Sequence, residues 1–290
     1  FIVVENQDDE KIQTVDVEKA LKEKSPKLYK FIPSFVIKFL KKIVHQKEIN
    51  EILIKFKHEK GLEFIKSGLN EMGVKTTSEG LENIEKEKSV IFVSNHPLGG
   101  LDGVAILQEI GKIRTDLHII VNDILMQIKN FEPLFIPVNK HGSNSRKNLS
   151  FIESLYSSNK CLIIFPADLV SRRQGNEIKD LEWKKSFISQ AIKQKKNIIP
   201  IFTEGKNSKR FYRIAYWRKK LGIKINIEML LLADEMFKQK GNTIHFKIGK
   251  PISWRTFNKT HSHKEWAQKI KTHVYALNNN DQKKYLPTID

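Results

Sequence analysis

Short apolar runs alternate with helical stretches from residue 89 onward. Each run is bounded by turn residues, as buried strands of an α/β sheet are, and the first five cover 89–94, 117–122, 134–138, 161–165 and 197–202. A sixth run, 243–248, alternates apolar and polar residues, which predicts an edge or late strand. Helical stretches fit between the runs at 103–112, 145–158 and 182–196. The alternation predicts an α/β fold with a mostly parallel central sheet flanked by helices.

A different pattern precedes these runs. After a polar lead-in over 1–26, Pro33 opens a helical stretch in which apolar residues recur on one side and lysines on the other. A second helical pattern follows over 49–69. We therefore expect an amphipathic, membrane-associating helical segment over 1–80, followed by one α/β domain over 81–290. The alternative is a surface helix packed on the protein's own core, because the apolar stripe would look the same.

The charge of the chain indicates which classes of partner it can bind. The chain carries 51 basic and 33 acidic residues, a net charge of +18, and eight basic residues lie among aromatic ones within 206–224. This composition suits an anionic membrane, an acidic carrier protein or single-stranded nucleic acid. Only 8 of the basic residues are arginine. Because proteins that read base edges rely on the arginine fork, no specific nucleic acid is expected as a partner.

Several functional classes are excluded by the sequence. No run of 18 apolar residues could cross a bilayer as a helix. Cys161 is the only cysteine, which excludes an internal disulfide and any C-x-x-C site. The serine-hydrolase elbow, the P-loop, the dinucleotide fingerprint and the zinc-protease motif are all missing. We expect neither a metal nor a resident cofactor.

The most informative stretch follows the first predicted strand and reads Asn95-His96-Pro97-Leu98-Gly99-Gly100-Leu101-Asp102. Ligands of open α/β sheets bind beyond the carboxyl ends of strands, where this stretch lies. Glycines allow the chain to double back, so that Asp102 can face His96. A carboxylate on one imidazole nitrogen fixes the tautomer and leaves the other nitrogen as a base. The alternatives are that Asp102 only caps the next helix and that His96 is an ordinary loop residue.

This stretch resembles the N-H-x-x-x-x-D motif of the glycerolipid (PlsC-like) acyltransferases. It is most similar to a subgroup with a hemolysin label that includes O-acyltransferases of ornithine- or glycine-containing lipids. Five residues separate His96 from Asp102, whereas the core family has four and the subgroup has the longer loop. The resemblance implies that His96 and Asp102 are catalytic and that Asn95, Gly99 and Gly100 contact substrate.

Three later stretches resemble further family blocks, in family order. Residues 135–140 resemble the F-I-D-R block that binds the acceptor's phosphate, with Lys140 in place of arginine and Arg146 as a nearby alternative. Residues 165–173 resemble the F-P-E-G-T-R-S block, and 197–201 resemble the strand that carries a proline near the acyl pocket. From these blocks the resemblance implies additional substrate contacts at Lys140, Arg146, Asp168, Ser171, Arg172 and Arg173.

The resemblance implies an enzyme of membrane lipid biosynthesis. It would move a fatty acyl group from an acyl carrier protein (ACP) or coenzyme A (CoA) thioester to the hydroxyl of a lyso-lipid. The acceptor would be a lyso-aminolipid or lysophosphatidic acid. His96, oriented by Asp102, would act as general base on a protein bound peripherally to the cytoplasmic face of the membrane. The alternative is a non-enzymatic basic protein that binds anionic membrane or nucleic acid.

Overall fold

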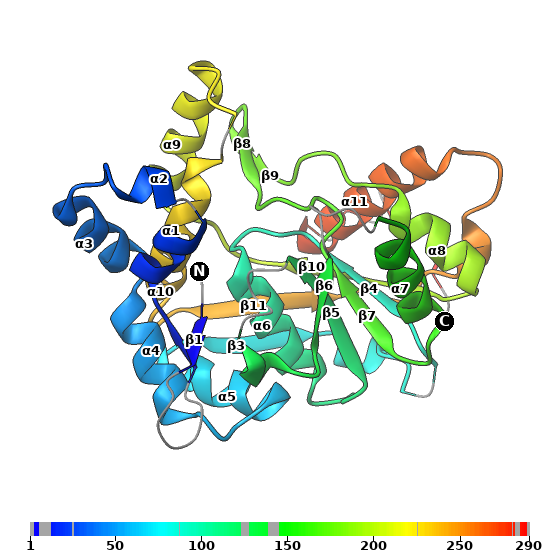
Figure 1. Ribbon diagram of the computed structural model, residues 1–290. Coiled ribbons are helices and arrows are strands. Elements are labelled where there is room, and N and C mark those ends of the chain that lie inside the picture. The colour runs from blue at the N-terminus through cyan, green and yellow to red at the C-terminus, as the bar shows by residue number, and fades with distance from the viewer. Residues whose placement is uncertain are drawn as a thin grey trace.

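The computed structural model describes residues 3–5, 13–24, 26–86, 88–122, 128–138, 145–224, 226–279, 281 and 285–288. Its centre is a sheet of seven strands in the order β3-β11-β10-β4-β7-β5-β6 (Figure 1). The strands are β3 (Lys75–Glu79), β4 (Ile91–Ser94), β5 (Leu117–Asn122), β6 (Phe135–Val138), β7 (Cys161–Ile164), β10 (Ile198–Thr203) and β11 (Thr243–Ile248). Only the β10–β11 pairing is antiparallel, so the predicted mostly parallel sheet is confirmed.

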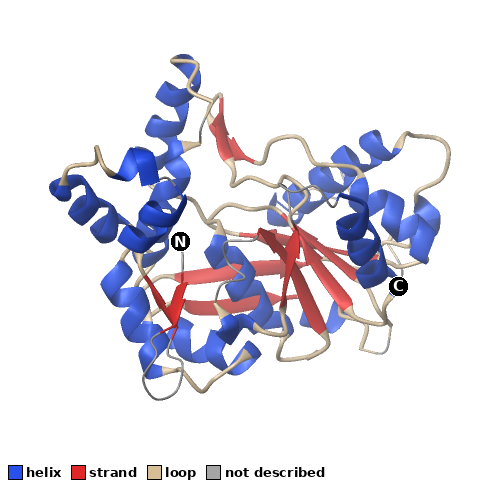
Figure 2. Ribbon diagram, in the orientation of Figure 1, coloured by secondary structure: helices blue, strands red, loops and turns tan. Residues whose placement is uncertain are grey.

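Two layers of helices cover the sheet (Figure 2). Helices α5 (Gly61–Glu71) and α6 (Gly100–Ile110) pack on one face, over Phe92, Ile119 and Ile163. Helices α7 (Ser145–Ser157), α8 (Ser186–Gln194) and α11 (His263–Asn279) pack on the other, over Ile91 and Val93. Consecutive residues of β4 thus point to opposite layers, as the pleat requires, and both layers are apolar. This double burial explains why the strands appear in the sequence as continuous apolar runs.

The remaining elements lie at the ends of this sandwich. Two antiparallel hairpins are formed by β1 (Val3–Glu5) with β2 (Gln13–Val15) and by β8 (Arg172–Gln174) with β9 (Glu177–Lys179). The other helices are α1 (Val17–Lys24), α2 (Pro26–Tyr29), α3 (Ser34–Ile43), α4 (Gln46–Lys55), α9 (Lys209–Lys220) and α10 (Leu232–Phe237). Short 3-10 turns are η1 (Leu81–Asn83), η3 (Lys129–Phe131), η4 (Ile227–Leu231) and η5 (Trp254–Thr256).

The N-terminal segment contains strands as well as the helices predicted within 1–80. Strand β3, inside the predicted helical range 1–80, pairs in parallel with β11 and forms one edge of the sheet. Strand β11 is therefore an inner strand. Helix α3 begins after Pro33, as expected, and divides its apolar residues between two sides: Ile37 is buried, whereas Phe35 and Phe39 are exposed. The stripe is only partly packed on the protein's own core.

Buried His273 on α11 gives folding a pH dependence. Its side chain has no exposed surface, its Nδ1 accepts a hydrogen bond from the Leu286 amide at 2.7 Å, and burial lowers its pKa from 6.5 to about 4. The folded state therefore binds a proton at His273 less readily than the unfolded state does. The contribution of neutral His273 to the free energy of unfolding is fully present above pH 6.5 and is lost as the pH falls toward 4. The pKa difference is worth about 3 kcal/mol at most.

We therefore expect His273→Asn to flatten the fall in unfolding free energy between pH 6.5 and 4. The asparagine amide oxygen can still accept from Leu286 but cannot titrate in this range. Urea unfolding at several pH values measures the difference from wild type. His263→Asn, at the exposed start of α11, is the control and should keep the wild-type slope. Equal slopes for wild type and His273→Asn would contradict the assignment.

Candidate active site

The carboxyl ends of β4, β7 and β10 meet at one edge of the sheet, and the loop 95–99 leaves β4 there to enter α6. Gly99 precedes the helix with φ 80° and ψ −135°, a conformation that side chains rarely adopt. A Cβ at this position would lie 3.1 Å from Leu232 Cδ1 and 3.3 Å from Val170 Cγ2. Glycine is therefore required both by the backbone and by the close approach of two neighbouring segments.

His96 and Asp102 face each other across this loop. His96 Nδ1 lies 3.0 Å from Asp102 Oδ2, and Asp102 is fully buried in the first turn of α6. The same Oδ2 accepts from the amides of Leu98 at 2.9 Å and Gly99 at 3.1 Å. Asp102 thus accepts from the loop's backbone amides, as a helix-capping carboxylate does, and also lies within 3.0 Å of the imidazole.

The environment of the pair suits proton transfer. Burial raises the pKa of Asp102, and the neighbouring His96 and the Leu98 amide offset only part of this rise. With Nδ1 turned to the carboxylate, Nε2 is the nitrogen left to take a proton from a substrate. The ring stacks on Phe165 at 4.2 Å between centroids and is 15% exposed. The imidazole is therefore packed against one ring beside the carboxylate and keeps a small exposed fraction.

A second buried carboxylate, Asp180, fixes the backbone beneath the histidine. Its Oδ1 accepts from the His96 amide at 3.1 Å and from the Ser171 hydroxyl at 2.6 Å, and its Oδ2 accepts from Trp183 Nε1 at 2.8 Å. Its own amide donates to the Tyr275 hydroxyl at 2.8 Å. Asp180 could not be predicted from the sequence, since it lies 84 residues from His96 in a short polar stretch.

Two predicted substrate contacts have structural roles instead. The Asn95 amide bridges β4 to β10: Nδ2 donates to the Thr203 carbonyl at 2.9 Å, and Oδ1 accepts from the Thr203 amide at 2.7 Å. Ser171 donates its hydroxyl to Asp180 and its amide to the His96 carbonyl at 2.8 Å. Asn95 is 2% and Ser171 1% exposed, so both act by positioning the loop that carries His96.

Arg172 is engaged within the protein. Its guanidinium is 2.9 Å from Glu228, lies over the Phe211 ring and is largely buried. Arg218 reaches the other oxygen of Glu228 at 2.8 Å, so one fully buried carboxylate joins two arginines. The structure therefore shows a salt bridge where the resemblance implied an anionic substrate contact. Asp168, with φ 59°, pairs with Lys184 on the exposed side of the same loop.

The other predicted contacts are scattered. Gly100 is exposed at the start of α6, and no described atom lies within 4 Å of a Cβ placed there. Arg173 is exposed on the β8–β9 hairpin and donates to the Gly175 carbonyl at 3.2 Å. Lys140 lies outside the described residues, and of Arg146 only the backbone, in α7, is described. In the described part of the chain, no group of three His, Cys, Asp or Glu side chains could hold a metal ion.

Comparison with known proteins identifies the family of the chain. A family model described as acyltransferase matches residues 19–283. The chain belongs to the acyltransferase family. Two curated proteins similar to this acyltransferase are each named lyso-glycine lipid O-acyltransferase. The one from Phocaeicola vulgatus is 47% identical over 270 residues, which cover 93% of this chain and 97% of the relative. The one from Bacteroides thetaiotaomicron is 44% identical over 93% of this chain and 99% of the relative.

A solved structure also resembles the acyltransferase. It is the crystal structure of the 1-acyl-sn-glycerophosphate (LPA) acyltransferase PlsC from Thermotoga maritima, with 16% identity and a TM-score of 0.46. The match covers 85% of this chain and 92% of that one. The predicted membership of an acyltransferase family is thus confirmed by the family model and the curated relatives. The alternative of a non-enzymatic binder is wrong, because the chain is an enzyme of acyl transfer.

Proposed function

We propose that this acyltransferase transfers a fatty acyl group from an ACP or CoA thioester to the hydroxyl of a lyso-lipid that carries a glycine headgroup. The observation that carries the proposal is the His96–Asp102 pair, with Nδ1 and Oδ2 3.0 Å apart at the carboxyl edge of the sheet. The names of the two curated relatives favour the lyso-glycine lipid over lysophosphatidic acid as acceptor.

The reaction follows from the orientation of the imidazole. Nε2 of His96 accepts the proton of the acceptor hydroxyl as its oxygen attacks the thioester carbonyl. The tetrahedral intermediate then expels the thiolate, which takes the proton back from the imidazolium, and the ester is formed. Asp102 holds the tautomer and stabilises the imidazolium. The proposed route needs neither an acyl-enzyme nor a metal ion.

The acceptor places the reaction at a membrane. Lyso-lipids reside in bilayers, and α3 presents the exposed rings of Phe35 and Phe39 beside Lys38 and Lys42. A basic amphipathic helix of this kind can lie in the interface of an anionic membrane. We therefore propose a peripheral enzyme on the cytoplasmic face. Among the described residues, no helix combines the length and apolar character needed to cross a bilayer.

The substrate contacts remain part of this proposal. A glycine headgroup ends in a carboxylate, which arginine and lysine bind well. Arg173, Lys140 and Arg146 are the candidates for this contact, since Arg172 is paired with Glu228. Gly99, Gly100 and Asp168 stay predicted contacts, although Gly99 is buried between Leu232 and Val170.

The acceptor is tested by offering labelled acyl-ACP or acyl-CoA to the purified enzyme with each lyso-lipid in turn. We expect label in the diacylated glycine lipid at a rate at least tenfold above that with lysophosphatidic acid. The lyso-glycine lipid lacking its free hydroxyl is the control and should take up no label. A faster reaction with lysophosphatidic acid would contradict the proposed acceptor while leaving acyl transfer intact.

A further inference from the structure

Helix α9 and the segment after it project from the body of the protein beside the β8–β9 hairpin (Figure 1). Large apolar side chains of this projection are exposed to solvent, with Leu221 69% and Trp217 52% exposed. The exposed set, which we call the α9 surface, is Tyr216, Trp217, Leu221, Ile223, Ile227 and Leu230. Four of them, Trp217, Leu221, Ile223 and Ile227, line one hollow, and an exposed apolar patch of this kind marks an interaction site.

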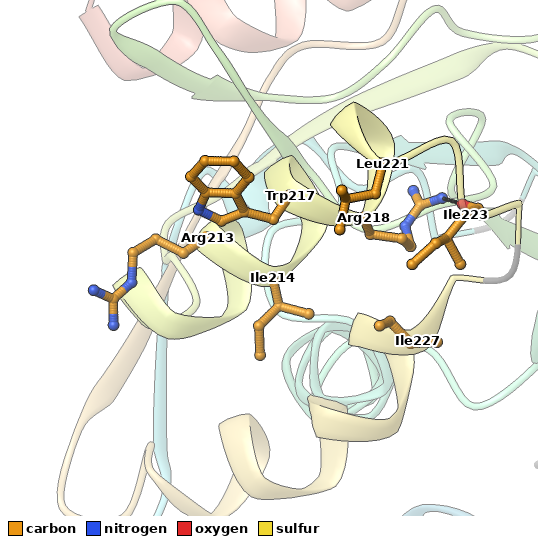
Figure 3. Close-up of a pocket in the computed structure, with 7 residues that line it drawn as sticks. All are labelled: Arg213, Ile214, Trp217, Arg218, Leu221, Ile223 and Ile227. Carbon is orange, nitrogen blue, oxygen red and sulfur yellow. Dashed lines mark hydrogen bonds between the residues drawn. The ribbon is translucent and has the colours of Figure 1, made fainter.

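The α9 surface is hollowed between α9 and η4. A hollow of about 380 Å³ has walls from Ile214, Trp217, Leu221 and Ile227, and Arg213 at its border points away from it (Figure 3). The remaining lining residues are Ile223 and Arg218, so inserted hydrocarbon would meet mainly apolar groups there.

The charge of the same segment is entirely positive. Residues 206–224 contain eight basic side chains and no acidic one. Lys219 and Lys220 are exposed at the end of α9, and the Lys220 ammonium lies 4.9 Å from the centre of the Trp217 ring. An indole beside lysines is the combination found at the interface of anionic bilayers.

The base of the α9 surface is anchored next to the active site. Glu228 of η4 lies between Arg172 and Arg218, at 2.9 and 2.8 Å. Phe211 of α9 packs in one cluster with Val170, and Val170 and Leu232 border Gly99 in the loop that carries His96. The position of α9 is therefore coupled by direct packing to the catalytic loop.

We propose that the α9 surface docks on an anionic lipid bilayer, with Trp217 at the interface and Lys219 and Lys220 on the lipid headgroups. A lipid surface fits better than an acidic protein because the apolar residues come from a projecting tip, and because exposed Phe31, Phe35 and Phe39 at α3 form a second apolar element. Ile43 of α3 packs against the cluster at the base of α9, so the two elements belong to one end of the molecule. Docking itself is independent of acyl transfer; only delivery of the acceptor to His96 rests on the proposed function.

Tryptophan fluorescence with full-length protein tests the docking. Trp183 and Trp266 are buried and Trp254 is partly buried, whereas Trp217 is half exposed. We expect a blue shift of the emission with vesicles of phosphatidylcholine and phosphatidylglycerol, and no such shift for Trp217→Phe. Brominated lipid should quench the same emission.

Vesicle flotation measures the charge contribution. Lys219→Glu with Lys220→Glu should weaken binding to phosphatidylglycerol vesicles at least tenfold, because the substitutions reverse two charges that attract the anionic headgroups. Lys185→Glu with Lys259→Glu is the matched control, since both lysines are exposed near α8, away from α9. The control pair and His96→Ala should bind like wild type.

Three results would overturn the proposal. The first is unchanged emission while the protein floats with the vesicles, and the second is equal binding with and without phosphatidylglycerol. The third is an emission shift on addition of acyl carrier protein but not of vesicles, which would assign the surface to an acidic protein. Failure of acyl transfer with normal docking would count only against the proposed function.

Discussion

His96→Ala is expected to lower the rate of acyl transfer by about 10²–10⁴-fold, the usual worth of a general base. In the proposed reaction the imidazole Nε2 takes the acceptor's proton, because Nδ1 faces Asp102 at 3.0 Å. The loss should fall mainly on kcat, since the alanine removes an interaction made in the transition state. Initial rates with labelled acyl donor at saturating lyso-lipid measure it.

Asp102→Asn tests the second member of the His96–Asp102 pair. The asparagine oxygen can take the place of Oδ2 and accept from the Leu98 and Gly99 amides, but the neutral amide no longer stabilises the imidazolium. In serine protease triads that exchange costs about 10⁴ in kcat. Both variants should retain the wild-type circular dichroism spectrum and vesicle binding. A folded Asp102→Asn enzyme with wild-type kcat would show that the carboxylate serves only the loop backbone.

Asp180→Ala is expected to damage both stability and catalysis. It leaves the His96 amide, the Ser171 hydroxyl and the Trp183 indole without their acceptor in a buried setting. Unsatisfied buried groups cost about 1–3 kcal/mol each, so the unfolding free energy should fall by about 3 kcal/mol or more. Because the His96 backbone is then less firmly held, kcat should fall at least tenfold, which rate and unfolding measurements on one preparation would show.

The control for Asp180 is a carboxylate in a similar bond network away from the site. Asp116 forms a two-bond pair with Arg114, at 2.9 and 2.7 Å, at the opposite end of the strands. Asp116→Asn should lower stability with little change in kcat. Asp180→Asn should recover part of the activity lost in Asp180→Ala, because one acceptor oxygen remains. Equal kcat for Asp180→Ala and Asp116→Asn would mean that Asp180 is only structural.

The fold could be predicted wherever burial on both faces leaves a continuous apolar run. Strands β5 and β11 match their predicted ranges. Both ends of the other four predicted strands, β4, β6, β7 and β10, lie within two residues of prediction. Strand β3 was missed because Lys75–Glu79 contains no apolar residue. Its inner side chains form hydrogen bonds instead: Thr76 and Ser78 both donate to Glu109 of α6, the latter at 2.6 Å. Because the inward-facing side chains of this strand are polar and hydrogen-bonded, they leave no apolar pattern in the sequence.

The site was predictable where its parts are close in sequence. His96 and Asp102 belong to one loop, and its glycines indicated that the chain turns back on itself. Partners separated by long stretches were not predictable: Asp180 lies 84 residues from His96, and Glu228 lies 56 from Arg172. Arg172 matched the family motif, yet only the folded chain shows that its guanidinium is paired with a buried carboxylate.

In the proposed reaction this chain acylates the hydroxyl of a lyso-aminolipid with His96 as its base. The most direct measurement follows the product by mass spectrometry when wild type and His96→Ala, both shown to be folded, receive lyso-glycine lipid and an acyl thioester. We predict the diacylated glycine lipid with wild type and a trace or none with His96→Ala. Equal yields from both proteins would contradict the account.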